Sequence, residues 1–578
     1  MPSAARPRRD WKAWSESRAA SIVTLGFLAA ATIAARLPFL LRGPRFFDSD
    51  EAVEGLMARH VLTGEYPMFL WGQRYKGVPE VYLTAAAFHW WPASAVSVVA
   101  LKAVTLGCFA VFVCLNFWLL TRLFTRRIAW IATAFLIVGP PSLVFWSLTG
   151  SAEIVMSFIA GTSLCLGLDA WRRPRSIGST GSRAGLVVAA IALGFGLWVQ
   201  QYILYYVVSL AIAAIDWTPQ GRAQIQEIIA ARRLPAWLRL ATRVLAIAAC
   251  AYVVLGVVAF LGAGFCVTPF GVEVTVTHPQ KMWWIAAALL LISAAGLMVG
   301  RLVSGTGVRA AWLAPALGFL LGYAPALVGR LAADGPGAPM ARMDLGRLRS
   351  SLSPLVRLAL PIVFGFKSPT TERLAVPAWP ALIIAIVIVV SFTGMRRAGQ
   401  LEEEGHGGRA FTPLFHIFLV VTPIVFLVSG SYIDAQSYRY LMPMHAALAV
   451  VYAVGIDRVY RWNRIAGVAL LTSLLALFAL QQADWYRRLE PDREATAIVS
   501  CLDRAGIRAA YADYWLSYKL TFLTGERVIV APVNGVDRYP PYTAIVRGQP
   551  SAPTIDRPPN GSTEPVACQS IIHRDPSR

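Results

Sequence analysis

The chain has 578 residues, of which 56% are hydrophobic and 15% are charged, so it is too apolar for an ordinary soluble protein. Its formal net charge is +21, yet the basic residues lie between long apolar runs and form no single tail or stripe. This distribution excludes nucleic acid as the partner and indicates a polytopic membrane protein whose cations fix its orientation.

The N-terminal stretch MPSAARPRRDWKAWSESR carries five Lys/Arg residues and precedes the first apolar run. That run has no small-residue cleavage site, so we interpret it as a retained span and not as a signal peptide. Residues 1–19 are therefore predicted to be a cytoplasmic N-terminal tail.

Residues 20–482 are predicted to form an all-α transmembrane domain, because about 20 apolar residues cross a bilayer as a helix. Thirteen candidate spans lie near 20–41, 96–122, 128–147, 152–170, 184–199, 201–215, 244–262, 284–300, 312–331, 377–394, 412–430, 442–456 and 465–482. With the N-terminus inside, six basic turns fall on the cytoplasmic side, those that carry Arg126/Arg127, Arg172/Arg173/Arg175, Arg222 to Arg243, Arg301/Arg309, Arg396/Arg397 and Arg458/Arg461/Arg464. This indicates a multi-pass protein of the cell membrane, with an extracytoplasmic C-terminus.

Residues 483–578 are predicted to form a small extracytoplasmic α/β module with a loose C-terminal end. DREATAIVSCLDRAG is typical of a helix that ends at Gly506, IRAAYAD of a strand, YWLSYKLTFLTG of a helix and RVIVAPV of a strand. Cys501 and Cys568 both lie in this module, where an oxidising compartment allows them to pair. The sequence leaves this disulfide open.

Five carboxylates follow the first span within a short helical segment: Asp48, Asp50, Glu51, Glu54 and Glu65. Asp48 is a good N-cap, and Glu51 completes a D-x-x-E capping box. Capping leaves Asp50 and Glu54 unexplained, because they lie on one face of the helix and repel each other unless a cation approaches. The outer loop 42–95 is therefore the candidate catalytic segment.

Cations and one further acid complete the candidate site. Arg74 and Lys76 lie in the same loop, in WGQRYKGVPEVYL. Glu153 lies at an outer turn in apolar surroundings, where an ionisable group is costly and suggests function, although a solvated carboxylate or a helix cap is the alternative. Arg439 in SYRYLMP lies beside two tyrosines, either as a site residue or as an interfacial anchor.

The outer loop 332–376 is basic without a topological reason, which an anionic lipid head group would supply. Its cations are Arg342, Arg347, Arg349, Arg357, Lys367 and Arg373. In the first outer loop, His60 or His89 is able to ligate a metal with Asp50 or Glu51, but no metal-ligand spacing is visible. A divalent cation therefore remains an open alternative, and no cofactor is established.

Residues 46–91 resemble the first outer loop of bacterial membrane glycosyltransferases of the GT-C class. These include the lipid A aminoarabinose transferases and the protein O-mannosyltransferase superfamily. The resemblance rests on DSDEA, the helix VEGLMARHVLTGEYP, RYKGVPEVYLT and AAAFHWW, with SYRYLMP late in the chain. Asp50 and Glu51 match the family's Asp-Glu pair, and the segment from Lys76 to Pro79 matches its Lys-Pro-Pro turn. Here Tyr75 precedes the lysine and Gly-Val precedes the proline, a departure from the family's pattern.

The resemblance implies transfer of a sugar from a polyprenyl-phosphate donor to a lipid, glycan or protein acceptor on the extracytoplasmic face, beside membrane lipid. Asp50 is the expected base, with a pKa raised by partial desolvation. Glu51 is either the alternative base or a partner that positions Asp50, and Glu153 is a further catalytic acid. Lys76, Arg74 and Arg439 are expected to bind the donor phosphate. Asp48, Glu54 and His60 are candidate acceptor or metal contacts.

Other functions stay open. A transporter is polytopic too, but it favours broken helices and ionisable residues near the midplane. Here the ionisable residues within spans are few, chiefly Arg36 and Lys102. A polyprenyl-linked glycan flippase or polymerase handles the same lipid but lacks the Asp-Glu loop after the first span. A receptor or scaffold leaves the acids at the membrane boundary unexplained.

Overall fold

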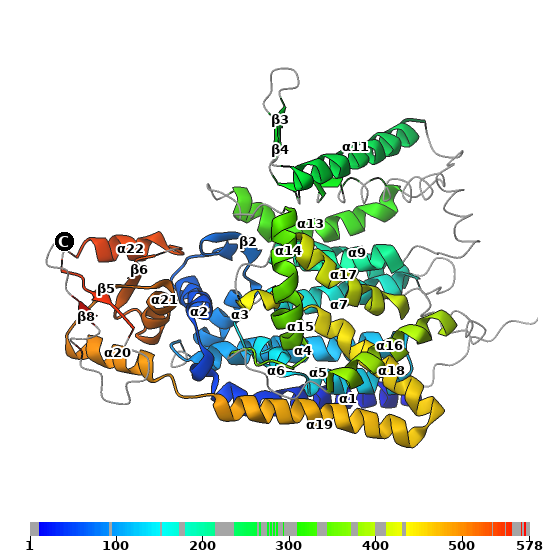
Figure 1. Cartoon of the computed structure of the whole chain (residues 1–578), viewed down its shortest axis with the longest axis horizontal. Helices are drawn as coiled ribbons and strands as arrows, with labels where there is room; N and C mark the ends of the chain where they lie inside the picture. The colour runs from blue at the N-terminus through cyan, green and yellow to red at the C-terminus, as the bar shows by residue number, and fades with distance from the viewer. Residues whose placement is uncertain are drawn as a thin grey trace, which may run out of the picture.

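The computed structural model of the chain is a bundle of long helices that carries a small α/β module at one end (Figure 1). It describes residues 11–91, 95–150, 153–172, 180–213, 236–262, 265–267, 274–276, 278–279, 281–283, 285–286, 289, 293, 309–331, 344–370, 380–398, 412–429, 435–534, 536–549, 551–557, 568 and 572–573. The prediction of an all-α membrane architecture with a small α/β module is confirmed.

The helix bundle contains the following elements in chain order. Its first half comprises α1 (Trp11–Leu41), η1 (Gly43–Phe46), α2 (Ser49–Leu62), β1 (Phe69–Leu70), β2 (Gln73–Gly77), α3 (Pro79–Trp90), α4 (Val98–Leu123), α5 (Arg126–Ile137), α6 (Pro141–Trp146), α7 (Glu153–Arg172), α8 (Thr180–Val199) and α9 (Ile203–Ala213). Its second half comprises α11 (Ala236–Leu261), β3 (Phe265–Val267), β4 (Val274–Val276), α13 (Arg309–Leu331), α14 (Leu345–Pro354), η4 (Leu355–Ala359), α15 (Leu360–Val363), α16 (Pro380–Ala398), α17 (Thr412–Ser429), η6 (Ala435–Leu441), α18 (Met444–Trp462) and α19 (Arg464–Arg488).

Six helical segments of the described residues are long and apolar enough to cross a membrane. They are Ala19–Leu41, Val98–Leu123, Glu153–Trp171, Leu240–Leu261, Leu313–Leu331 and the segment Arg464–Arg504, which contains α19. Shorter apolar helices occupy Arg183–Val199, Ile203–Ala213, Pro380–Thr393 and Pro413–Val428. The count of thirteen spans stays a prediction, and most of the run 284–300 lies outside the described residues.

The span predicted over 128–147 is broken, which corrects the sequence analysis. α5 ends at Ile137 and α6 begins at Pro141, because the Gly-Pro-Pro segment between them cannot continue the hydrogen bonds of a helix. Arg36 of α1, fully buried, donates from Nη2 to the Leu136 carbonyl oxygen at 2.8 Å and from Nη1 to that of Ile137 at 3.0 Å. The buried arginine of the first span therefore caps the end of a broken helix.

The C-terminal module contains the four elements that the sequence predicts and three that it misses. Its elements are α20 (Arg493–Arg504), β5 (Ala509–Ala512), α21 (Tyr514–Leu523), β6 (Ile529–Pro532), α22 (Pro540–Arg547), β7 (Thr554–Ile555) and β8 (Ile572–His573). The strands form one sheet in the order β6-β5-β7-β8, with β7 and β8 antiparallel and the other pairs parallel. α22, β7 and β8 were missed because such short segments carry little periodicity.

A disulfide joins Cys501 of α20 to Cys568, the pairing that the sequence left open. The two Cα atoms are 5.4 Å apart and the residues are 67 positions apart in the chain. Cys501 is buried in the module core beside Ile498 and Leu502. The bond therefore fastens the end of the chain to the first helix of the module.

The module packs against α2, the helix that follows the first span (Figure 1). Phe522 of α21 shares a buried cluster with Phe47, Met57 and Tyr518, so one core spans both parts. Gly55 allows this close approach, because a Cβ atom at that position would lie 2.5 Å from the Phe522 ring. The module is therefore held directly over the acidic helix of the first outer loop.

His60 fastens the other end of α2 to the module. Its Nδ1 atom is 2.9 Å from Glu65, and its Nε2 atom is 2.9 Å from Glu526 and 3.1 Å from the Tyr542 hydroxyl. Arg59 donates from Nε to the other oxygen of Glu526 at 2.8 Å. This polar latch, formed by Arg59, His60, Glu65, Glu526 and Tyr542, ties α2 to α22 and to the turn after α21.

We expect the latch to be strongest between about pH 4.5 and 6.5. Burial opposes ionisation of both partners, but their mutual hydrogen bonds outweigh it: the pKa of Glu526 falls from 4.5 to about 2, and that of His60 rises above 6.5. The stability from Glu526 is present above pH 4.5, whereas that from His60 is complete below pH 6.5 and is lost as the pH rises through the raised pKa. Hydrogen exchange of α22 should therefore accelerate from pH 6 to 8.5, after correction for the intrinsic rate.

The matched variants are His60→Gln and His89→Gln. The first should abolish this additional acceleration, and the second should retain it because His89 lies at the far end of α3. Identical corrected profiles for the wild type and His60→Gln would show that the latch does not govern docking of the module.

Candidate active site

The start of α2 uses two of its acids for structure. Asp48 is the N-cap, and its Oδ1 atom accepts a hydrogen bond from the Glu51 backbone N–H at 3.0 Å, as the sequence predicts. A capping box would also need the Glu51 side chain to accept a hydrogen bond from the Asp48 backbone N–H. Between these two described residues that second bond is not formed. The Glu51 side chain turns away from Asp48 and into the protein interior, where it is fully buried.

Glu51 forms a buried ion pair with Lys102 of α4. The Lys102 Nζ atom lies 2.7 Å and 2.6 Å from the two carboxylate oxygens, and the Gly150 backbone N–H donates to Oε2 at 3.1 Å. Burial raises the pKa of Glu51 to about 7, against the opposing effect of the Lys102 ammonium. Because neither side chain is exposed, this pair fixes α2 against α4 and the segment before α7 and is closed to a substrate.

Asp50 points to a different side of α2, because successive residues of a helix lie about 100° apart. Its carboxylate is 27% exposed. The Tyr514 hydroxyl of α21 donates a hydrogen bond to Oδ1, and Arg538 Nη2 lies 3.6 Å from the same oxygen. Arg439 Nη1, from η6, lies 4.0 Å from Oδ2. Three distant segments of the chain therefore converge on Asp50.

The expectation of a raised Asp50 pKa is wrong for the protein without substrate. Burial does raise it, but the charges of Lys76 and Arg538, the Tyr514 hydrogen bond and the charge of Arg439 together lower the pKa below its ordinary value of 3.8. The sequence predicted the position of Asp50 at the membrane boundary. It did not predict that cations from distant parts of the chain lie beside this residue. Asp50 is therefore ionised at neutral pH, and its surroundings are electropositive.

Lys76 and Glu153 lie beside Asp50 as a second charged pair. Lys76 Nζ is 2.8 Å from Glu153 Oε2, and both side chains are largely buried. Burial lowers the pKa of Lys76, but Glu153 and Asp50 raise it above its ordinary range, so the lysine stays charged. Glu153 is the first residue of α7. The sequence analysis also considered a place at the start of a helix for this residue.

Arg74 lies two residues before Lys76 in β2, so the two side chains share one face of the strand. Its Nη1 atom is buried and has no hydrogen-bond partner among the described residues. A buried N–H donor without a partner is costly, and an anionic ligand would satisfy it. The role of Arg74 toward a phosphate stays a prediction.

Arg439 is framed by aromatic rings. Its guanidinium carbon lies 5.4 Å from the centroid of Tyr440, and Tyr440 meets Tyr202 edge-on at 6.1 Å. The Tyr202 hydroxyl is buried without a hydrogen-bond partner among the described residues. Arg439 also lies beside Asp50, and its role as a site residue or as an interfacial anchor stays a prediction.

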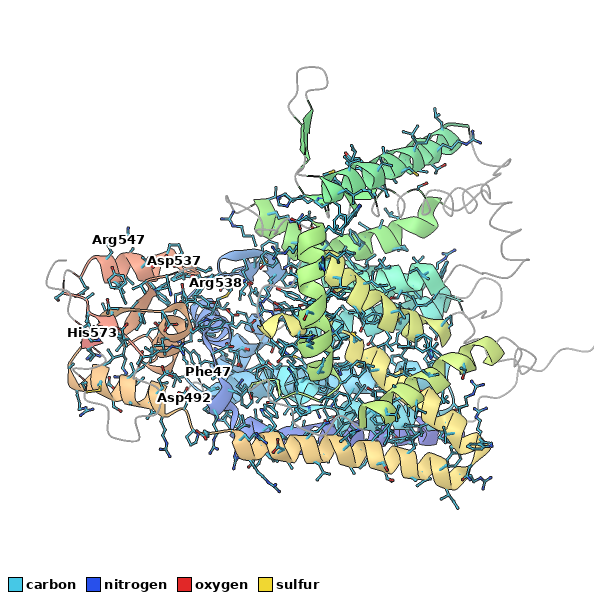
Figure 2. The ribbon with its side chains drawn as sticks, in the orientation of Figure 1. Phe47, Asp492, Asp537, Arg538, Arg547 and His573 are labelled. Carbon is cyan, nitrogen blue, oxygen red and sulfur yellow. A yellow bond between two sulfur atoms is a disulfide. The ribbon has the colours of Figure 1, made fainter. Side chains whose placement is uncertain are left out.

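Two site residues that the sequence analysis missed come from the module. Tyr514 begins α21 and Arg538 precedes α22; Arg538 Nε also donates to the Tyr514 hydroxyl at 3.1 Å. Figure 2 shows Arg538 where the module meets the helix bundle. Tyr514 lies 464 positions from Asp50, so no local pattern could connect them.

Glu80 is a third residue that the sequence analysis missed. A single acid in the apolar stretch PEVYLTAAAFHWW could have drawn attention to it. It is fully buried, and the Thr105 hydroxyl donates a hydrogen bond to it. Burial raises its pKa to about 8, and Thr105 only partly opposes that shift. Glu80 therefore carries a proton at neutral pH, between the charged pairs of Glu51 and Glu153.

The remaining predicted contacts lie elsewhere or have other partners. His60 belongs to the latch, and Glu54 is 4% exposed within α2. Among the described residues, no group of three or more His, Cys, Asp and Glu side chains is arranged to hold a metal ion. The involvement of His60, Glu54 or Asp48 with an acceptor stays a prediction, as does any divalent cation.

The basic outer loop is described over residues 344–370, where it forms α14, η4 and α15. Its cations Arg342 and Arg373 lie outside the described residues. The charges placed at Asp50 come instead from β2, η6 and the module. A role of this loop toward a lipid head group stays a prediction.

Solved structures similar to this chain include two membrane glycosyltransferases of the GT-C class. Archaeal oligosaccharyltransferase AglB from Archaeoglobus fulgidus, in complex with an inhibitory peptide and a dolichol-phosphate, is 12% identical with a TM-score of 0.43, covering 89% of this chain and 64% of that chain. ArnT from Cupriavidus metallidurans bound to undecaprenyl phosphate is 10% identical with a TM-score of 0.46, covering 90% of this chain and 88% of that chain.

This chain thus spans less than two thirds of that AglB chain. No protein-family model and no curated protein matches it. At these identities and TM-scores, the likenesses carry no conclusion about the chemistry of the Asp50 site.

We expect Lys102→Met to destabilise the protein by up to about 3–5 kcal/mol, because Glu51 loses its buried cation and either stays charged without a partner or takes up a proton. The double variant Glu51→Gln, Lys102→Met should recover most of that loss, since no buried charge remains. Thermal unfolding in detergent would measure both. A double variant as unstable as the single one would show that packing, and not the unpaired charge, causes the loss.

Proposed function

We propose that this protein is an integral membrane glycosyltransferase that transfers a sugar from a polyprenyl-phosphate donor to an acceptor on the extracytoplasmic face, with Asp50 as general base. The observation that carries the proposal is the convergence of Lys76, Arg439 and Arg538 on the part-exposed Asp50 carboxylate. The resemblance of the first outer loop to the GT-C class points in the same direction.

The charges of the site leave room for a phosphate. Lys76, Arg439 and Arg538 supply three positive charges, whereas Asp50 and Glu153 supply two negative ones. A donor phosphate would add negative charge to this excess of cations, and the unpartnered Nη1 atom of Arg74 offers a further donor. Arginine and lysine groups fixed in advance stabilise the phosphate as it departs with growing charge.

The transfer requires a base on the side opposite the leaving phosphate. The acceptor's O–H or N–H group attacks the anomeric carbon, the bond from that carbon to the phosphate oxygen breaks, and the acceptor proton moves to the Asp50 carboxylate. A carboxylate held below its ordinary pKa is ionised but weakly basic. Donor binding would raise the Asp50 pKa again, because a phosphate bound to Arg439 and Lys76 offsets the positive charges that lower it.

The other residues of the cluster position these groups. Glu51 and Lys102 hold the start of α2 in place, so that the neighbouring Asp50 points away from the buried pair and stays partly exposed. Tyr514 donates to Asp50 and orients its carboxylate. Because Tyr514 and Arg538 belong to the module, we propose that the module completes the site and helps to orient the acceptor.

Asp50→Asn should reduce turnover by about 10²- to 10⁴-fold, the usual contribution of a general base. Purified protein would be assayed with a panel of polyprenyl-phosphate sugars and with lipid, glycan and peptide acceptors. Asp484→Asn, on the exposed end of α19, is the matched control and should leave turnover unchanged. Equal turnover of Asp50→Asn and wild type would remove the base role, and wild-type inactivity across the panel would favour a flippase or transporter.

The acid limb of kcat should lie at higher pH than that of kcat/KM, by about one pH unit or more. The profile of kcat/KM reports the free enzyme, in which the Asp50 pKa is below 3.8. The profile of kcat reports the donor complex, in which the phosphate offsets the cations. In Arg439→Gln the two limbs should approach each other, because one of those cations is already missing. Coincident limbs in the wild type would contradict activation of Asp50 by the donor.

A further inference from the structure

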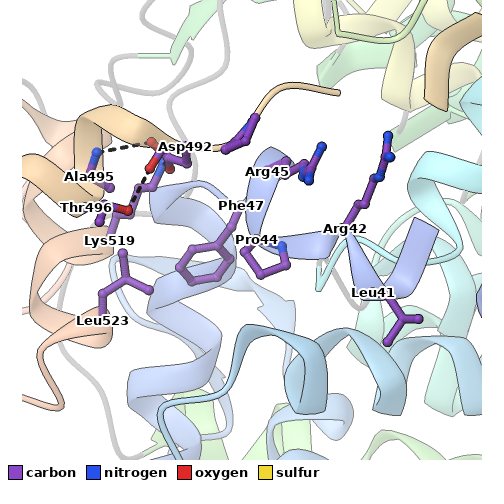
Figure 3. Close-up of a pocket in the computed structure, with 11 residues that line it drawn as sticks. Leu41, Arg42, Pro44, Arg45, Phe47, Asp492, Ala495, Thr496, Lys519 and Leu523 are labelled. Atoms are coloured by element: carbon purple, nitrogen blue, oxygen red, sulfur yellow. Dashed lines mark hydrogen bonds and ion pairs between the residues drawn. The ribbon is translucent and has the colours of Figure 1, made fainter. Parts of the chain in front are cut away.

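A pocket with cationic lining residues, here called the cationic pocket, lies where the end of α1 and η1 meet α20 and α21 (Figure 3). Its volume is about 300 Å³, and residues of η1, α20 and α21 surround it. The lining residues that carry the argument are Leu41, Arg42, Arg45, Phe47, Asp492 and Lys519. None of them belongs to the charged cluster around Asp50.

The pocket has an excess of positive charge. Its lining contains three cationic residues, Arg42, Arg45 and Lys519, and one carboxylate, that of Asp492, which lies 2.5 Å from Lys519 Nζ. Asp492 is also the N-cap of α20, so the positive end of that helix adds to the same field. Figure 3 shows Lys519 on one side of Phe47 and the two arginines on the other.

The two arginines are fixed in place by the end of α19. Arg42 Nη1 donates to the Tyr486 carbonyl oxygen and Arg45 Nη1 to that of Leu489, each at 2.5 Å. Each guanidinium has five N–H donors, so these bonds orient the group without using up its capacity. Preorganised arginines of this kind suit the tetrahedral oxygens of a phosphate.

The position of the pocket selects a lipid over a soluble ion. Leu41, at the end of α1, is 65% exposed, and Ile33 and Leu37 expose 41% and 45% of their surfaces. These residues are spaced by four, so they form one apolar stripe along the helix that ends at the pocket. An acyl or prenyl chain on this stripe would bring its head group to Arg42, Arg45 and Lys519.

We propose that this pocket binds the phosphate head group of a membrane lipid, as a site separate from the Asp50 cluster. The bound lipid joins the first span to α20 and α21, so it stabilises the docked position of the module. This inference does not depend on the glycosyltransferase activity proposed above, because it concerns different residues and binding alone.

The test is a titration of the purified full chain, in uncharged detergent, with hexadecyl phosphate and separately with inorganic phosphate. Binding is followed by the rise in the unfolding temperature and by isothermal calorimetry. Lys519→Gln should weaken binding of hexadecyl phosphate about tenfold, as expected for one charge-assisted hydrogen bond. Arg527→Gln, a module arginine paired with Asp503, is the matched control and should bind like the wild type.

Two further variants distinguish binding at this pocket from misfolding and from binding at the Asp50 cluster. Thr496→Trp places a large side chain in the lining of the pocket without removing a charge and should also weaken binding, which covers the case in which Lys519→Gln misfolds. Arg439→Gln alters only the Asp50 cluster and should leave a binding event that remains sensitive to Lys519. Equal affinity of the wild type, Lys519→Gln and Thr496→Trp would overturn the proposal, as would inorganic phosphate binding as tightly as the lipid.

Discussion

The buried ion pair between Glu51 and Lys102 is the constraint on which the candidate site depends. Both charges are removed from water, so each needs the other, and the Gly150 N–H adds a third contact. The pair locks the start of α2 against α4 and against the segment before α7. Asp50, the preceding residue, is thereby turned outward. The fully buried Glu51–Lys102 pair thus sets the direction of the partly exposed Asp50 side chain.

Around Asp50 the protein gathers cations that its own acids do not balance. Lys76 is engaged by Glu153, whereas Arg439 and Arg538 approach Asp50 only at 4.0 Å and 3.6 Å. Such a cluster is a poor ion-pair network but a good anion site, because its cations are fixed and incompletely neutralised. The lowered pKa of Asp50 expresses the same imbalance. Under the proposed function, the same electrostatics would link binding of the donor phosphate to the basicity of the carboxylate.

The C-terminal module contributes residues to the candidate site. It contacts α2 through the Gly55–Phe522 approach, through the His60 latch and through Tyr514 on Asp50. The cationic pocket lies along the same junction, lined by residues of η1, α20 and α21. One boundary between membrane helices and module therefore holds two clusters of positive charge. A lipid that carries a phosphate is the kind of ligand that we propose for both clusters.

The sequence by itself determined the membrane class, the acidic start of α2, the Asp48 cap and four elements of the module, because these follow from local composition, periodicity and capping. It also singled out Lys76, Glu153 and Arg439, since charged groups at a membrane boundary need a reason. Only the tertiary structure decided that Glu51 is buried on Lys102, that Gly-Pro-Pro breaks a span, and that Tyr514 and Arg538 reach Asp50. Those outcomes rest on contacts between residues up to hundreds of positions apart, and local patterns carry no information about such contacts.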